Sequence, residues 1–218
     1  MLSVADYLQI VIGIMTIFSP FAAIPIFVSL TSSSTLEEKA QTAKTAAFAA
    51  CIAGLISVWI GQYVLAFFGI SISSFKIAGG ILLLLMAINM INAKTPKAKN
   101  TKSELKEAQK KSTNVSEIAV VPLAIPLIAG PGSISTIIIF AQNPNTLFHL
   151  MIMSVIIIAI SIYIFLTLRM ATFISKKLGV TGINIISRVM GLILASISIE
   201  FIVSGLLAVF PILGAKGF

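Results

Sequence analysis

Long apolar stretches separated by short polar ones make up most of the chain. Crossing the hydrocarbon core of a bilayer, which is about 30 Å thick, takes about 20 predominantly apolar residues in a helix. Six windows meet this length: residues 5–31, 44–69, 74–92, 117–141, 147–169 and 183–210. The pattern therefore predicts an all-α membrane protein with six transmembrane helices. The first window opens on Asp6 rather than on basic residues, so we interpret it as a helix and not as a signal peptide.

The amino-acid composition also indicates a membrane protein. The 218 residues are 58% hydrophobic and 10% charged, with a mean hydropathy of +1.08, whereas soluble domains have about 25% charged residues. The net charge of +8 indicates membrane orientation rather than nucleic-acid binding, because short cytoplasmic loops accumulate Lys and Arg. All basic residues except Lys76 and Lys216 lie on or beside connections on one side of the predicted membrane.

This asymmetry predicts an inner-membrane protein with both termini outside and the 93–116 loop in the cytoplasm. We interpret that Lys-rich loop as a solvated segment, with binding to acidic lipid as the alternative.

The two halves of the chain resemble each other. AAIPIF at 22–27 resembles LAIPLI at 123–128, and FKIAGGILL at 75–83 resembles SRVMGLILA at 187–195. Since each half has three spans, the halves must insert in opposite orientations. The sequence thus predicts a first repeat over 1–92 and an inverted second repeat over 117–218. Inverted repeats are typical of secondary transporters, although some channels also have them.

Prolines and glycines interrupt the first and fourth windows, and we expect both helices to be broken near the midplane. Backbone freed at membrane depth must be satisfied by protein or by a water-filled cavity, and a restarted helix directs N–H donors at an anionic group. We expect Pro131 to begin such a helix, with donors from Gly132, Ser133 and Ile134 and hydroxyls from Ser133, Ser135 and Thr136. The alternative is a kinked helix that only packs. The predicted substrate-binding residues are Ser19, Pro20, Pro25, Asn89, Pro126, Gly130, Pro131, Gly132, Ser133 and Ser135.

Glu200 lies inside the sixth window and is the predicted coupling residue. A carboxylate within the membrane is costly and usually faces a pathway, where it can take up and release a proton. The alternative is a neutral glutamic acid that holds helices together. His149 lacks clustered ligands, so no metal site is expected, and Cys51 has no partner for a disulfide. No HExxH motif or Ser–His pairing points to an enzyme, so no catalytic residue is predicted.

Four segments carry a resemblance to the MarC family of bacterial and archaeal membrane proteins: residues 19–30, 68–91, 121–136 and 186–206. This resemblance implies six transmembrane helices, kinship with the LysE-type transporter superfamily, and transport of small neutral amino acids such as glycine and alanine. The chain departs from the family pattern at Ser19, where relatives often have Asp or Asn, and at Ala22, where they often have Gly. It also departs at Asn89, where Asp is frequent, and at Glu200, where Gln is frequent.

Together these features predict a secondary transporter for small neutral amino acids that works by alternating access. Its coupling ion is a proton or sodium, and it needs no other cofactor. An exporter of another small metabolite and a channel-like pore are the alternatives, and the oligomeric state is left open. The expected partners are the solute and the lipid bilayer, with no nucleic acid.

Overall fold

Helices form all the regular structure in the described part of the computed structural model, which comprises residues 2–18, 20–31, 34–92, 130–142, 146–210 and 212. These helices are α1 (Val4–Phe18), α2 (Pro20–Leu30), α3 (Leu36–Phe67), α4 (Ile72–Ile91), α7 (Pro131–Ala141), α8 (Leu147–Arg169) and α9 (Ala171–Val209). The prediction of an all-α protein is confirmed for this part of the chain.

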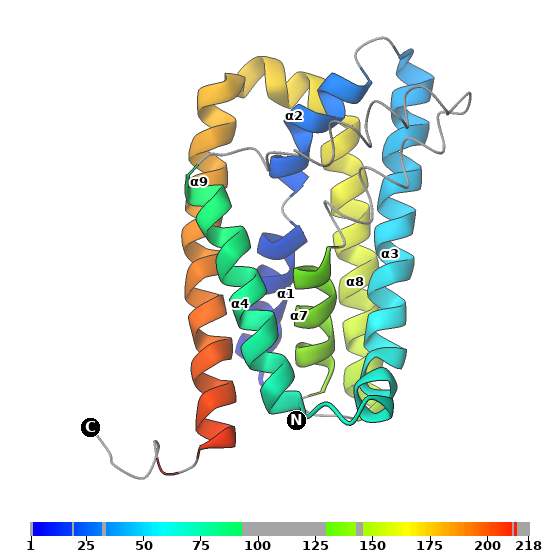
Figure 1. Ribbon diagram of the computed structural model, residues 1–218. Coiled ribbons are helices and arrows are strands. Elements are labelled where there is room, and N and C mark those ends of the chain that lie inside the picture. The colour runs from blue at the N-terminus through cyan, green and yellow to red at the C-terminus, as the bar shows by residue number, and fades with distance from the viewer. Residues whose placement is uncertain are drawn as a thin grey trace.

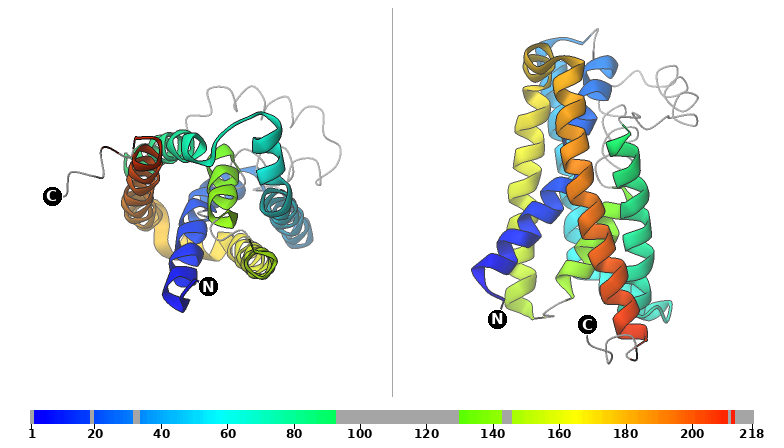
Figure 2. Two further views of the ribbon diagram at one scale, coloured as in Figure 1. Left: turned by 90° about the horizontal axis from the view of Figure 1, so that it is seen from below. Right: turned by 90° about the vertical axis from the view of Figure 1, so that its left-hand side faces the viewer.

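The helices form an elongated bundle around α7 (Figures 1 and 2). α1 begins and α9 ends at the lower end of Figure 1, whereas α3 begins and α8 ends at the upper end. α7 packs against α1, α3, α4 and α8, which explains why nearly all its side chains are buried. The most extensive packing joins α4 to α9 and α3 to α8.

Four helices are long and apolar enough to cross a membrane: α3, α4, α8 and the Thr181–Val209 part of α9. α1 and α7 are apolar but shorter, with 15 and 11 residues. Much of the fourth predicted span, residues 117–129, lies outside the described residues, as does the 93–116 loop. The six-span inverted repeat with two broken helices therefore stays a prediction.

Two helices extend beyond the apolar windows that predicted them. α3 begins at Leu36, ahead of the window at 44, because a capping box fixes its start: Glu38 N–H donates to Thr35 Oγ1 at 3.3 Å and Thr35 N–H donates to Glu38 Oε2 at 2.7 Å. α9 begins at Ala171 but has non-helical backbone at Gly179, with φ 63° and ψ −179°. Glycine adopts this left-handed φ without steric cost, so the chain turns there before the long membrane segment.

A short helix that begins with a proline and is followed by a long helix occurs twice in the chain, and the two copies run in opposite directions. α2 has 11 residues and starts at Pro20, and α7 has 11 residues and starts at Pro131. Each precedes a long helix whose N-cap is a threonine, Thr35 for α3 and Thr146 for α8. α2 and α8 run toward the upper end in Figure 1, whereas α7 and α3 run toward the lower end.

Glycines bring α4 and α9 into backbone contact. A Cβ atom added at Gly80 would lie 2.8 Å from the Ser198 carbonyl oxygen, and one added at Gly205 would lie 2.8 Å from the Ser73 carbonyl oxygen. The two contacts are mirrored between antiparallel helices. Small residues that let backbones approach this closely are typical of helix interfaces in membranes.

The apolar core has two parts. The larger cluster joins α1, α2, α3, α8 and the upper part of α9 around fully buried side chains such as Phe27, Ala46 and Ile157. The smaller cluster lies mainly between α4, α7 and α9 and includes Leu83 and Leu194. α7 contributes residues to both clusters, so the two parts of the core meet along this helix.

Candidate functional site

α7 begins inside the bundle, at a glycine that is followed by a proline. Gly130 is the N-cap with extended backbone (φ −69°, ψ 175°), and Pro131 follows at the first helical turn. The prediction that Pro131 begins a helix is therefore confirmed, while the break before it stays a prediction. The expectation that Ile134 offers its N–H to a solute is wrong. This N–H donates to the Gly130 carbonyl at 3.1 Å, so the donor is used within the helix.

The hydroxyls in the first turns of α7 are buried but turn back toward the backbone. Ser135 Oγ donates to the Gly132 carbonyl at 3.0 Å, and Thr136 Oγ1 donates to the same oxygen at 2.8 Å. Ser133 is also buried. Since the hydroxyl protons of Ser135 and Thr136 are used within the helix, these side chains can accept a hydrogen bond from a solute but do not donate one in this conformation.

α4 covers one side of this helix start. A Cβ atom added at Gly132 would lie 2.6 Å from Met86 Sδ and 3.2 Å from Leu83 Cδ2, and one added at Gly79 would lie 3.2 Å from the Ser135 side chain. Glycine on each helix thus lets the start of α7 lie against α4. Asn89 is exposed and lies three residues beyond Met86 on α4, one turn further toward the upper end.

The first-helix half of the predicted site is less completely described. α1 ends at Phe18 and α2 begins at Pro20, which is buried. Ser19 and Pro126 lie outside the described residues, and Pro25 lies within α2. That the two breaks meet around a small polar cavity stays a prediction.

Glu200 lies on α9, far along the bundle from Asn89. It is exposed and lies nine residues before the end of α9 at Val209, roughly 14 Å from the lower end of that helix. Asn89 lies near the opposite end of α4. The structure therefore separates these two residues along the bundle axis and places Glu200 in the lower half of its helix.

Sequence reasoning missed a buried hydrogen-bond network at His149, which is 0% exposed. Its Nε2 lies 2.9 Å from the Phe140 carbonyl oxygen and its Nδ1 lies 3.0 Å from the Tyr7 hydroxyl. Because a carbonyl only accepts, Nε2 carries the hydrogen and Nδ1 accepts from Tyr7. The ring thus ties α1, α7 and α8 together at the lower end. Tyr7 lies 142 residues from His149 in the sequence and Phe140 lies on the preceding helix, so no pattern within one helix indicates these partners.

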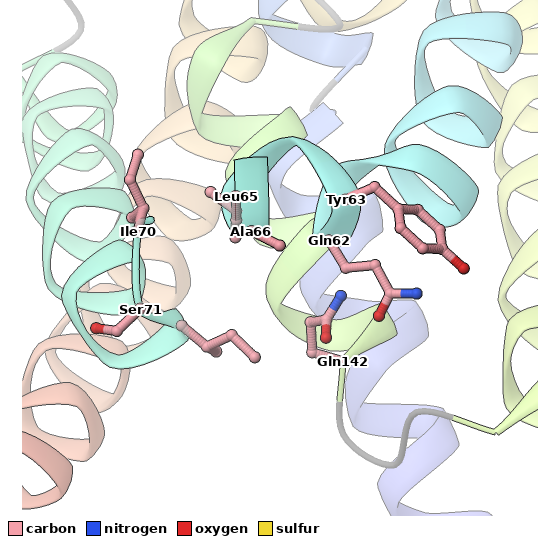
Figure 3. A pocket seen from close by; sticks show the side chains of 8 residues that line it. Gln62, Tyr63, Leu65, Ala66, Ile70, Ser71 and Gln142 are labelled. Atoms are coloured by element: carbon pink, nitrogen blue, oxygen red, sulfur yellow. The ribbon is translucent and has the colours of Figure 1, made fainter. Parts of the chain in front are cut away.

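A cavity of about 460 Å³ opens near the lower end of the bundle, where α3 ends and α4 begins (Figure 3). The amide groups of Gln62 and Gln142 point toward each other across it. Its remaining lining residues are Tyr63, Leu65, Ala66, Ile70, Ser71 and Ile72. This cavity is distinct from the predicted midplane site, since none of the predicted binding residues lines it.

Comparison of the sequence with known protein families identifies the family of the chain. A profile described as MarC family integral membrane protein matches residues 4–210. The chain belongs to the MarC family. A UPF0056 membrane protein of Buchnera aphidicola from Acyrthosiphon pisum is 42% identical to it, over 94% of both chains.

Similar relatives of the MarC protein occur in other organisms. The UPF0056 membrane protein YhcE of Escherichia coli K12 is 40% identical over 94% of both chains. The UPF0056 membrane protein MJ1677 of Methanocaldococcus jannaschii is 38% identical, over 89% of this chain and 92% of its own. No solved structure matches the chain. The chain is thus a multi-pass integral membrane protein of a family found in bacteria and archaea.

Proposed function

We propose that this MarC protein is a secondary transporter that moves small neutral amino acids, such as glycine and alanine, across the cytoplasmic membrane. Transport proceeds by alternating access and is coupled to a proton or sodium gradient. The solute carboxylate is received at the N-terminal ends of α2 and α7, with Asn89 beside the second of them. Both termini face the outside, so that the lower end of Figure 1 is the external end.

One observation carries the proposal: two eleven-residue helices, α2 and α7, each begin with a proline and run in opposite directions. Helix N-termini favour anions because their first N–H groups lack partners within the helix and the helix dipole is positive there. Opposed half-helices of this kind are typical of transporters built from inverted repeats. Burial of the start of α7 is consistent with a site inside the bundle.

Close packing around α7 supports a small solute. Met86 and Leu83 of α4 lie against Gly132, and Ser135 lies against Gly79. These contacts bring α4 close to the helix start, which favours a solute with a compact side chain. Glycine and alanine satisfy this limit, and their carboxylate supplies the anion that a helix N-terminus favours.

Two other functions are compatible with six apolar spans: export of another small metabolite, and a channel-like pore. Uptake into liposomes separates them from the proposal. The purified protein is reconstituted and supplied with labelled glycine or alanine under an imposed proton or sodium gradient, with protein-free liposomes as the control. We expect uptake to be saturable. The internal solute concentration should exceed the external one only when a gradient is present. Flux that does not saturate and ignores the gradient would instead indicate a pore.

Direction is tested in the same vesicles by loading the solute inside and reversing the gradient. Faster efflux than uptake under matched gradients would assign export. Absence of flux for every small neutral amino acid, with protein that is folded and correctly inserted, would refute the proposed substrate class.

A further inference from the structure

Lys76 of α4 bridges to α9 inside the predicted membrane region. Its Nζ donates to Ser204 Oγ at 3.2 Å. Lys76 lies four residues after the start of α4, roughly 6 Å along the helix axis, and is half-buried. The ammonium group therefore lies across the helix pair and is bound to a neutral hydroxyl.

Glu200 lies one turn from that hydroxyl. Residues four apart on a helix have neighbouring side chains, with Cβ atoms about 5–6 Å apart, so Ser204 and Glu200 share one side of α9. Among the described residues, the Glu200 carboxylate has no hydrogen-bond or ion-pair partner. The Lys76 ammonium, which is bound to Ser204, therefore lies on the side of α9 that carries Glu200.

No other described cation is placed to neutralise this carboxylate. Arg188, the other cation on the long part of α9, lies twelve residues away, roughly 18 Å along the axis. On the remaining helices packed against α9, the ionisable side chains of the lower half are already bonded elsewhere: Asp6 to Ser3, and Tyr7 to His149. Opposite charges within membrane helices usually pair with each other, because an isolated charge there is costly.

We propose that Lys76 is the internal counter-ion of Glu200, and that its ammonium replaces the coupling cation on this carboxylate once per cycle. When the external proton or sodium ion occupies Glu200, Lys76 is bound to Ser204, as in this structure. When that cation leaves, Lys76 moves to Glu200, so the carboxylate is never left alone in the membrane. Lys76 is a positioning residue in this scheme, and its role rests on the transport function proposed above.

The pair is tested first by stability, which does not depend on transport. The unfolding midpoints of Lys76→Met, Glu200→Gln and the double variant are measured for the purified protein in lipid nanodiscs. When the coupling cation is withheld, in sodium-free buffer at alkaline pH, removing the lysine alone leaves the Glu200 carboxylate without a counter-ion, so we expect the unfolding midpoint of Lys76→Met to fall by roughly 4–10 °C. Neutralising both residues should recover most of this loss. Equal and additive effects of the two substitutions would show that the residues do not interact.

The coupling role is tested in reconstituted vesicles. Lys76→Met should abolish accumulation driven by the gradient, reducing the internal-to-external ratio to about one, and should retain exchange of labelled for unlabelled solute. Lys76→Arg, which keeps the charge, should keep accumulation. Arg188→Met is the matched control, since it removes a membrane cation remote from Glu200, and it should accumulate solute like the unmodified protein.

The outcomes separate the two proposals. Normal accumulation by Lys76→Met would overturn the counter-ion role while leaving transport established. No uptake by the unmodified protein would refute the transport function, yet recovery of stability in the double variant would still show the Lys76–Glu200 pair.

Discussion

Replacing Gly80 or Gly205 with a larger residue should force α4 and α9 apart. In each case the added Cβ would lie 2.8 Å from a backbone oxygen of the facing helix, whereas ordinary contact begins near 3.4 Å. A backbone oxygen cannot rotate away as a side chain can, so the helix axes must separate by about 0.6 Å. A gap of this size forfeits a quarter to a half of the dispersion energy of the atoms that lose contact.

Overpacking of this kind costs typically about 1–3 kcal/mol. We therefore expect Gly80→Ala and Gly205→Ala each to lower the free energy of unfolding by about that amount, measured by denaturant titration in mixed micelles. The control is Ala78→Val, which adds bulk at an exposed position of α4 and should change stability by less than about 0.5 kcal/mol.

The double variant makes the test sharper. Both glycines lie at one helix contact, so the separation forced by the first substitution makes room for the second. The combined loss should therefore be smaller than the sum of the single losses, as expected for coupled neighbours. Single variants as stable as the unmodified protein would refute the backbone contact itself. Fully additive losses would show that the two contacts are independent.

Other substitutions address the helix connections and the orientation. His149→Phe leaves a backbone carbonyl and the Tyr7 hydroxyl unpaired and should cost about 1–3 kcal/mol in the same titration, while Tyr7→Phe should cost less; equal costs would contradict the bridging role. Gly179→Ala places a side chain at positive φ with open space around it, so it should cost about 1–2 kcal/mol through backbone strain alone, and a neutral result would show that the turn is not left-handed. A reporter that works only outside the cytoplasm should be active when fused after Phe218 and inactive when inserted at Lys102; the reverse activities would invert the proposed orientation.

The sequence predicted helices best where a helix is apolar from end to end. The windows 74–92 and 147–169 differ by at most two residues at either end from α4 (Ile72–Ile91) and α8 (Leu147–Arg169). A search for apolar residues missed the first turns of α3, because these turns carry charge outside the apolar region and are fixed by the capping box of Thr35. The same search missed the turn at Gly179, since a glycine alone does not reveal the sign of its φ.

The candidate site divides in the same way between local and tertiary features. The start of α7 at Pro131 follows from proline's missing N–H and fixed φ, which are properties of one residue. The close approach of Met86 to Gly132 depends on how α4 and α7 pack, and the sequence does not show it. The sequence also left the alignment of the two halves ambiguous. Aligning their short motifs pairs Pro25 with Pro126, whereas the order of helices in the structure pairs Pro20 with Pro131.

The packing indicates which parts of the protein can move against each other. Backbone contacts at Gly80 and Gly205 fix α4 to the lower part of α9. The larger core cluster holds α1, α2, α3 and α8 together with the upper part of α9, which contributes Ala171 and Ile183. α7 contributes Ile137 to the larger cluster and Ile139 to the smaller one, so it lies at the junction of both. Packed units move by repacking their boundary rather than by deforming their interiors. In the proposed transport cycle, α4 and the lower part of α9 would therefore rock as one unit against α1, α2, α3 and α8. The solute site at the start of α7 would lie on the boundary that repacks.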